Sequence, residues 1–133
     1  MSQENVEIVR GAFQAFGAGG IDAALSFFSP DVVWYPTDRW VDDAAYRGHD
    51  GVRRIAAAFS GNFDDFRYEV DDLRDAQDRV VALVDMIGRI KQSQDEVSQR
   101  LGLVLSGFSD GTIREVRVFS SWSDALEAVG LKQ

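Results

Sequence analysis

The chain has 133 residues, 45% of them hydrophobic, which is enough for one domain that buries roughly two thirds of its unfolded surface. Its 14 basic and 22 acidic side chains give a formal net charge of −8, which repels nucleic-acid phosphates and anionic lipid surfaces. The lack of cysteine and the single histidine exclude disulfides, thiolate nucleophiles and the common Cys- and His-ligated metal sites. We therefore expect no nucleic-acid or membrane partner, no metal and no cofactor.

The N-terminus has no basic stretch followed by an apolar run, and the longest clean apolar run covers only residues 80–84. Leader peptides and membrane-spanning helices need longer apolar runs. The sequence therefore predicts a cytoplasmic protein in which residues 1–133 form a single domain.

The first half of the chain has mainly helical periodicity. Val6, Val9, Phe13 and Phe16 predict an amphipathic helix over about residues 3–17, which the glycine-rich segment 17–20 ends. A second short helix is expected over 21–28, and a strand over 32–35 that stops at Pro36. A polar loop over 37–45 is expected to precede a third helix, whose apolar residues run from Val52 to Phe59.

From Phe66 onward the apolar period changes to two. Strands are predicted over 66–70, 80–90, 97–108 and 112–120, joined by turn-like segments, which is typical of an antiparallel meander. Ser121 and Asp124 have the spacing of a helix start, and Gly130 is placed to end that helix. Helices followed by an antiparallel sheet predict the α+β class.

Both alternating sets of strand 80–90 are largely apolar: Val81, Leu83 and Ile87 on one face, and Ala82, Val84 and Met86 on the other. One face is expected to cover helices or a cavity, and the other to meet a second subunit, which predicts a homodimer through the outer face of the sheet. Glycine inside a strand marks a bulge, a bend or a close approach of another backbone, and this applies to Gly88, Gly102 and Gly107.

Three segments carry a family resemblance: Ser29 to Pro36 (SPDVVWYP), Tyr46 to Arg53 (YRGHDGVR) and Asp110 to Ile113 (DGTI). Their order and spacing, from about residue 4 to 131, resemble the SnoaL-like polyketide cyclase group of the nuclear transport factor 2-like and ketosteroid isomerase-like superfamily. The resemblance implies a cystatin-like cone, with N-terminal helices packed in a strongly curved antiparallel sheet that encloses one mostly apolar pocket. It also implies a homodimer.

The same resemblance implies which side chains line or close the pocket: Phe13, Phe16, Trp34, Trp40, Tyr46, Phe59, Val84, Met86 and Val118. Taken individually, Phe13 and Phe16 favour plain core, because aromatic residues at helical spacing are more often core. Trp40 is equally compatible with a dimer contact. Val84, Met86 and Val118 match the positions where limonene epoxide hydrolase activates water. All three are apolar here, so that route is not expected.

Ketosteroid isomerase has a carboxylate base just before a proline at the end of its first strand, and the matching place here is Tyr35 or Pro36. The nearest carboxylate is Asp38, either a displaced general base or a solvated loop residue. Arg100 alternates with Gly102 and Val104 on the face assigned to the pocket. There it would bind a carboxylate or enolate oxygen, unless it pairs with Glu96 or Asp95.

Three other charged features have structural interpretations. Asp85 is predicted to point away from the pocket and to pair with Arg89 or a partner chain, and His49 to serve a helix start. Residues 64–78 hold seven acids and two arginines, which is typical of a strand edge protected against aggregation.

The expected function is binding of a small apolar molecule, with cofactor-free proton transfer of the cyclase or isomerase type. The alternative is a non-catalytic small-molecule-binding or accessory dimeric domain. The two differ in whether a titratable group with a perturbed pKa faces the cavity.

Overall fold

The computed structural model describes residues 2–36 and 45–131, except for the side chains of Ser2 and Phe59. The elements, in chain order, are α1 (Ser2–Ala24), a short 3-10 helix η1 (Leu25–Phe27), β1 (Phe28–Tyr35), β2 (Tyr46–Arg47), α2 (Gly48–Ser60), β3 (Phe63–Ala76), β4 (Arg79–Ile90), β5 (Glu96–Ser106), β6 (Ile113–Phe119) and α3 (Trp122–Ala128).

The N-terminal helix is interrupted where the glycine-rich segment predicts a break. Gly20 has a φ of 76°, in the left-handed region that glycine adopts without steric cost, and the helical path changes direction there. The first strand begins at Phe28 rather than at Val32, because Phe28 pairs with Ile113 at the start of β6. The chain therefore turns from helix to sheet earlier than its periodicity predicts.

The described strands form one sheet in the order β2-β1-β6-β5-β4-β3. Strands β3 to β6 pair antiparallel in sequence, which confirms the predicted meander. However, β1 pairs with β6 in parallel, so the sheet is mixed rather than wholly antiparallel. At the opposite edge is β3, which confirms that the acidic segment 64–78 belongs to an edge strand.

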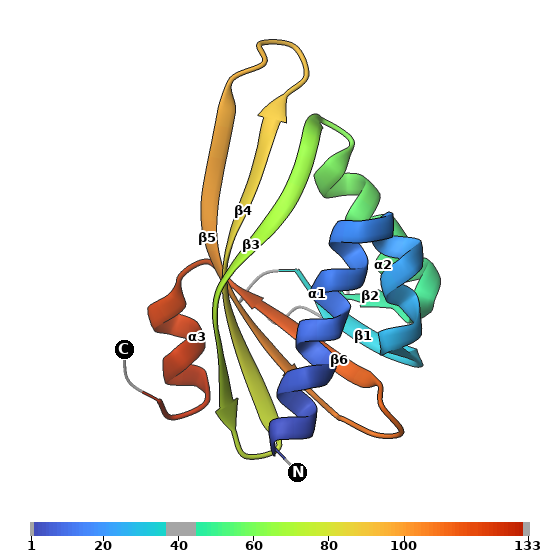
Figure 1. Cartoon of the computed structure of the whole chain (residues 1–133), viewed down its shortest axis with the longest axis vertical. Helices are drawn as coiled ribbons and strands as arrows, with labels where there is room; N and C mark the ends of the chain where they lie inside the picture. Colours follow the sequence, from blue (N-terminus) through green and yellow to red (C-terminus); the bar gives the residue numbers. More distant parts are fainter. Residues whose placement is uncertain (1, 37–44, 132–133) are drawn as a thin grey trace.

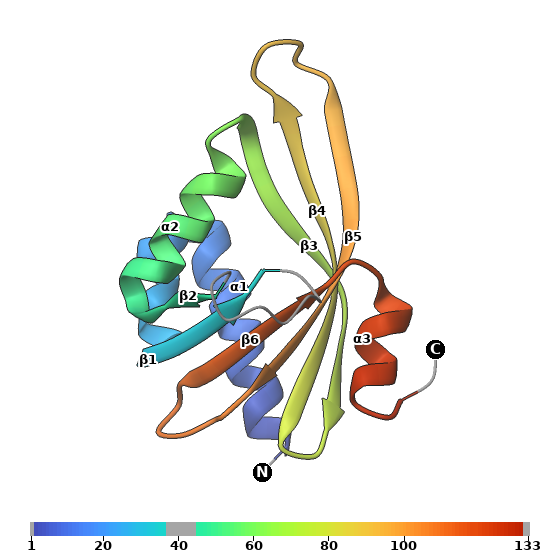
Figure 2. The same ribbon diagram turned by 180° about the vertical axis from the view of Figure 1, so that it is seen from behind.

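Helices cover both faces of the twisted sheet: Figure 1 shows α1 and α2 on one side and α3 on the other, and Figure 2 shows the same layers from behind. We call the side against α1 and α2 the inner face and the side against α3 the outer face. The inner face carries the larger core cluster, which includes Val9, Val32, Val52, Val84 and Ile113. These three layers are the expected α+β cone.

Helix α3 covers part of the face that the sequence assigns to a partner subunit. Val81 and Leu83 are buried against Ala125 and Leu126 of α3. Alternation along β4 predicts two apolar faces, but the second is covered here by the chain's own C-terminal helix. The helix begins as predicted, because the Ser121 hydroxyl accepts a hydrogen bond from the Asp124 amide at 3.1 Å.

Within residues 2–36 and 45–131, none of the helices has the length and apolar content that a bilayer crossing requires.

Candidate ligand-binding site

A cavity of about 60 Å³ lies between α1, α2 and the inner face of the sheet, and we call it the inner cavity. Aromatic side chains make up much of its wall: Phe13, Phe16, Phe28, Trp34, Phe66 and Tyr68. The other lining residues are aliphatic: Val9, Ala12, Ile21, Ala24, Val52, Ile55, Ala56, Leu103 and Leu105. A lining of this kind is suited to an apolar ligand.

The helical period of α1 places two of these rings over β3. The ring centroids of Phe13 and Phe16 lie 5.7 and 5.4 Å from that of Tyr68, and the Phe13 ring meets Tyr68 edge to face at 73°. On the β1 side of the cavity, the rings of Phe28 and Trp34 lie 5.8 Å apart. The aromatic part of the cavity wall therefore comes from α1 and from two strands far apart in the sheet, β1 and β3, with ring contacts that favour defined orientations.

The indole of Trp34 brings a polar group to this apolar wall. Trp34 pairs with Val116 across β1 and β6 and points to the inner face. Its Nε1 atom is buried and has no hydrogen-bond partner in the part of the chain that the structure describes. Buried indole N–H groups usually have an acceptor, so an unpaired one beside a cavity is a potential anchor for a ligand.

Tyr68 adds a phenol to the same wall. Burial raises the pKa of Tyr68 to about 12, because an ionised phenolate would lose its hydration there. The hydroxyl therefore stays neutral at physiological pH and can donate a hydrogen bond. It is not a proton acceptor for acid–base chemistry under these conditions.

Among the described lining residues there is no aspartate, glutamate, histidine, lysine or arginine. Proton abstraction from a bound molecule would therefore need a base from elsewhere in the chain. What the described residues offer is apolar contact and hydrogen-bond donation from Trp34 and Tyr68.

Arg100 does not lie at this cavity, so its predicted place on the pocket face is wrong. Its guanidinium lies 4.3 Å from the ring centroid of Trp122 in α3, and its Nε is 3.6 Å from the Asp85 carboxylate. Alternation correctly groups Arg100 with Gly102 and Val104, but that set faces α3. Asp85 is on the outer face as predicted, although its partner is Arg100 rather than Arg89.

Tyr35 also points away from the cavity. The Arg117 guanidinium lies over its ring at 4.9 Å, and both residues are on the outer face, opposite to Trp34 and Val116. Tyr35 is therefore not placed to exchange a proton with a molecule in the inner cavity.

The other predicted site residues divide into three groups. Phe13, Phe16 and Trp34 line the inner cavity, whereas Val84 and Val118 are buried in the core beside it and Met86 packs against that core. Tyr46 lies under the guanidinium of Arg54 at 5.6 Å and does not line the cavity. Asp38, Trp40 and the side chain of Phe59 lie outside the described part of the chain.

His49 has a structural role, as the sequence predicts. Its Nε2 atom is 2.9 Å from the carbonyl oxygen of Phe28, which ties the start of α2 to the start of β1. This contact helps to hold α2 over the cavity, where Val52 and Ile55 contribute to the lining.

The aromatic residues that sequence reasoning missed are Phe28, Phe66 and Tyr68. Phe66 and Tyr68 do appear in the period-two pattern that predicts β3. The acidic residues around them favour an edge strand, and nothing local indicates that their side of that strand faces α1.

Comparison with known proteins places these features in a family. The SnoaL-like domain model matches residues 9–116. No curated protein sequence matches the chain.

Solved structures resemble the fold over nearly the whole chain. A putative SnoaL-like polyketide cyclase from Jannaschia sp. CCS1 has 19% identity and a TM-score of 0.75, covering 99% of this chain and 95% of that chain. A hypothetical protein with a ketosteroid isomerase-like fold from Catenulispora acidiphila, in complex with trimethylamine, has 18% identity and a TM-score of 0.72, covering 94% and 93%. A putative polyketide cyclase from Xanthomonas campestris pv. campestris has 18% identity and a TM-score of 0.71, covering 97% and 98%.

Proposed function

This chain belongs to the SnoaL-like domain family, and from that premise we propose that its inner cavity binds a small, neutral, mostly apolar molecule that carries a hydrogen-bond acceptor such as a carbonyl oxygen. The observation that supports this most directly is the indole N–H of Trp34, a cavity-lining residue, which is buried and has no hydrogen-bond partner among residues 2–36 and 45–131. One fold can host several chemistries, so the proposal is based on the site rather than on the fold.

The energetics favour an acceptor over a purely apolar ligand. Leaving a buried donor unpaired costs about 1–3 kcal/mol, and a ligand oxygen beside Trp34 would recover part of this. Apart from the Tyr68 hydroxyl, the rest of the wall contributes through removal of apolar surface from water, at about 25 cal/mol per Å². A carbonyl group on a hydrocarbon frame fits both parts of the wall.

The cavity volume of about 60 Å³ limits the size of a ligand bound in this conformation. Benzene is accepted by a dry cavity of roughly 150 Å³, so a ligand of that volume, 2-butanone included, enters only if the lining side chains move outward. The neighbour from Catenulispora acidiphila is in complex with trimethylamine, a compact molecule without a ring. A short-chain ketone is a suitable first probe.

The test compares 2-butanone with 2-methylbut-1-ene, which replaces the carbonyl oxygen with a methylene group at nearly the same shape. NMR titration measures both dissociation constants for the wild type and for Trp34→Phe. We expect the substitution to shift the ratio of the two constants against the ketone by roughly threefold or more, as the loss of one hydrogen bond predicts.

Trp122→Phe is the matched control, because the Trp122 indole donates to the Val84 carbonyl oxygen at 3.1 Å and does not line the cavity. It should leave the ratio unchanged. If Trp34→Phe also leaves the ratio unchanged, Trp34 does not bind the carbonyl oxygen and the proposal is wrong.

Proton transfer on a bound carbonyl compound is the second candidate, favoured by the neutral phenol of Tyr68, which can donate to an enolate oxygen. The predicted base is Asp38. The test is exchange of the α-protons of 2-butanone in D₂O, followed by NMR. Exchange that exceeds the buffer rate and is lost in Asp38→Asn supports catalysis, whereas exchange at the buffer rate supports a binding protein.

We also infer that two copies pair through the part of the outer face that β1 and β6 form. Val33 and Tyr35 are only half-buried there, in contrast to the residues under α3. Close by, the Arg117 and Glu115 side chains form an ion pair at 2.6 Å, which can continue into a polar rim around the contact. A homodimer of this kind would leave the inner cavity of each copy accessible.

A further inference from the structure

Phe66 lines two separate spaces on the inner face of the sheet. One is the inner cavity, and the other is a space of about 140 Å³ under the β4–β5 hairpin, on the same inner face. We call this second space the outer hollow because it is open to water. Apart from Phe66, the outer hollow is lined by Phe63, Met86, Gly88, Val97, Ser98 and Gln99. The side chain of Phe66 therefore stands between the two.

The inner cavity is well below the roughly 150 Å³ of a dry cavity that accepts benzene, and the outer hollow, at about 140 Å³, is open to water rather than enclosed. Joined, the two exceed the volume that accepts benzene. Movement of the Phe66 side chain is thus the change that would turn two small spaces into one site for a ring-containing ligand.

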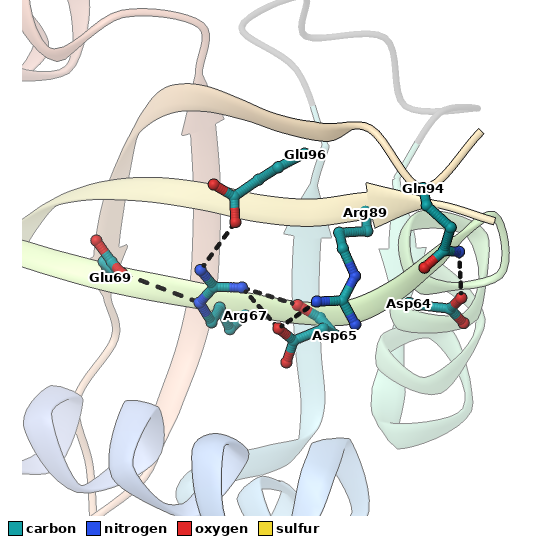
Figure 3. Close-up of polar contacts among 7 residues, drawn as sticks. All are labelled: Asp64, Asp65, Arg67, Glu69, Arg89, Gln94 and Glu96. Atoms are coloured by element: carbon teal, nitrogen blue, oxygen red, sulfur yellow. Dashed lines mark hydrogen bonds and ion pairs between the residues drawn. The ribbon is translucent and has the colours of Figure 1, made fainter.

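The backbone around Phe66 is held by pairing with β4 and carries ion pairs on the outer face. Asp65 has a φ of 54° in a bulge that shifts the register between β3 and β4. Figure 3 shows its carboxylate between two arginines, with Arg67 Nη1 at 3.1 Å and Arg89 Nη1 at 3.7 Å. Arg67 also reaches Glu96 of β5 at 3.4 Å, so the bulge is connected to the neighbouring strands.

The Phe66 side chain itself is held by ring contacts. Its centroid lies 5.6 Å from that of Tyr68, 6.2 Å from Phe63 and 6.3 Å from Phe16. Such contacts can be exchanged for contacts with a ligand ring. The Phe66 ring can turn about its side-chain torsions, whereas the strand that carries it is fixed by its pairing with β4.

The outer hollow is mostly apolar, with Ser98 and Gln99 as its polar lining residues, and it is open to water. Val97 is 39% exposed, and all residues from Glu96 to Arg100 are exposed. In Figures 1 and 2 the β4–β5 hairpin extends beyond α2, which leaves this part of the inner face without a helix over it. Gly88 allows Phe63 to lie against β4, since a Cβ there would be 3.0 Å from the Phe63 Cβ.

We propose that Phe66 is a movable divider within one elongated binding site, and that the ligand class is a neutral, elongated, ring-containing ketone. This rests on the proposed function for the carbonyl end at Trp34. The ring system would occupy the position that the Phe66 side chain leaves, and its far end would lie between Met86 and Gln99. Both sets of described lining residues lack charged side chains, which favours a neutral ligand.

The experiment measures the dissociation constant of 2-acetylnaphthalene by isothermal titration calorimetry. Phe66→Ala removes the divider and should lower the constant at least fivefold, because the open state no longer has to be populated first. Gln99→Trp places a bulky side chain in the outer hollow and should raise the dissociation constant of 2-acetylnaphthalene at least tenfold. Gln92→Trp, an exposed substitution in the same hairpin that lines neither space, should stay within twofold of the wild type.

The proposal is overturned if either Phe66→Ala or Gln99→Trp leaves the constant within twofold of the wild type, or if no variant binds 2-acetylnaphthalene. If Phe66→Ala does not fold by circular dichroism, Phe66→Leu takes its place with the same direction expected. The dissociation constant of 2-butanone distinguishes this proposal from the proposed function, because Gln99→Trp should leave that constant within twofold of the wild type. If Trp34→Phe does not weaken 2-butanone binding relative to 2-methylbut-1-ene, the carbonyl anchor is rejected. The expected effects of Phe66→Ala and Gln99→Trp on 2-acetylnaphthalene do not depend on that outcome.

Discussion

Gly102 of β5 lies directly beneath Ala125 of α3. A Cβ atom built at Gly102 would overlap the Cβ of Ala125 and lie 3.1 Å from the carbonyl oxygen of Ser121. Ala125 is fully buried at this contact. The missing side chain at position 102 therefore sets how closely the C-terminal helix approaches the outer face of the sheet.

Gly102→Ala should lower the free energy of unfolding by about 1–3 kcal/mol, the usual cost of overpacking a filled core. Urea denaturation measures it. Gly17→Ala is the control, because Gly17 is an exposed helical residue with open space around its Cβ position. That change should be neutral or stabilising by up to about 1 kcal/mol. Equal effects of the two substitutions would show that α3 does not dock closely on Gly102.

The order of the elements could be predicted because it follows from local periodicity. Val6, Val9, Phe13 and Phe16 predict α1, and the change to period two after Phe66 predicts the meander. The parallel pairing of β1 with β6 could not be predicted in this way, since it joins segments about 80 residues apart and no turn connects them.

The candidate site could be predicted only in part. Alternation separates the residues of a strand into two sets but does not say which set faces which helix, and this led to the wrong face for Arg100. Gly102 belongs to the same alternating set as Arg100 and could have indicated which element that set faces. A glycine in a strand predicts close approach of another segment, and here that segment is α3 rather than a ligand.

Arg100→Ala should leave the affinity for 2-butanone unchanged, because Arg100 stacks on Trp122 and lies on the opposite face from the inner cavity. The stability loss should be about 1 kcal/mol, since the Arg100 side chain is 68% exposed in its ion pair with Asp85. NMR titration and urea denaturation measure the two effects. A tenfold weaker ketone affinity would instead place Arg100 at the binding site.

Val33→Glu should convert a dimer into a monomer in solution, because it places a charge in the contact inferred around Val33 and Tyr35. Light scattering coupled to size-exclusion chromatography measures the mass. Val70→Glu is the matched control, since Val70 is 39% exposed on β3, at the opposite edge of the sheet. A wild-type monomer, or an unchanged dimer in Val33→Glu, would rule out this interface.

Tyr68 should make stability fall with rising pH above about 10. Its pKa is about 12 in the folded chain, against an ordinary value of 10.0. Below pH 10 the phenol is neutral in both the folded and the unfolded chain, so the contribution of Tyr68 to the free energy of unfolding is fully present. Between these values the unfolded chain loses the proton and the folded chain keeps it, so unfolding releases a proton and the free energy of unfolding decreases.

Between pH 10 and 12 each pH unit lowers the free energy of unfolding by about 1.4 kcal/mol, so the total loss of stability from Tyr68 is about 2–3 kcal/mol. Tyr68→Phe removes this contribution and leaves the other titrating groups in place. Urea denaturation of both proteins from pH 9 to 12 should therefore show the wild type losing stability relative to Tyr68→Phe by that amount. A constant difference across the range would mean that the Tyr68 hydroxyl is hydrated in the folded protein, and the inner cavity would then be wet rather than suited to an apolar ligand.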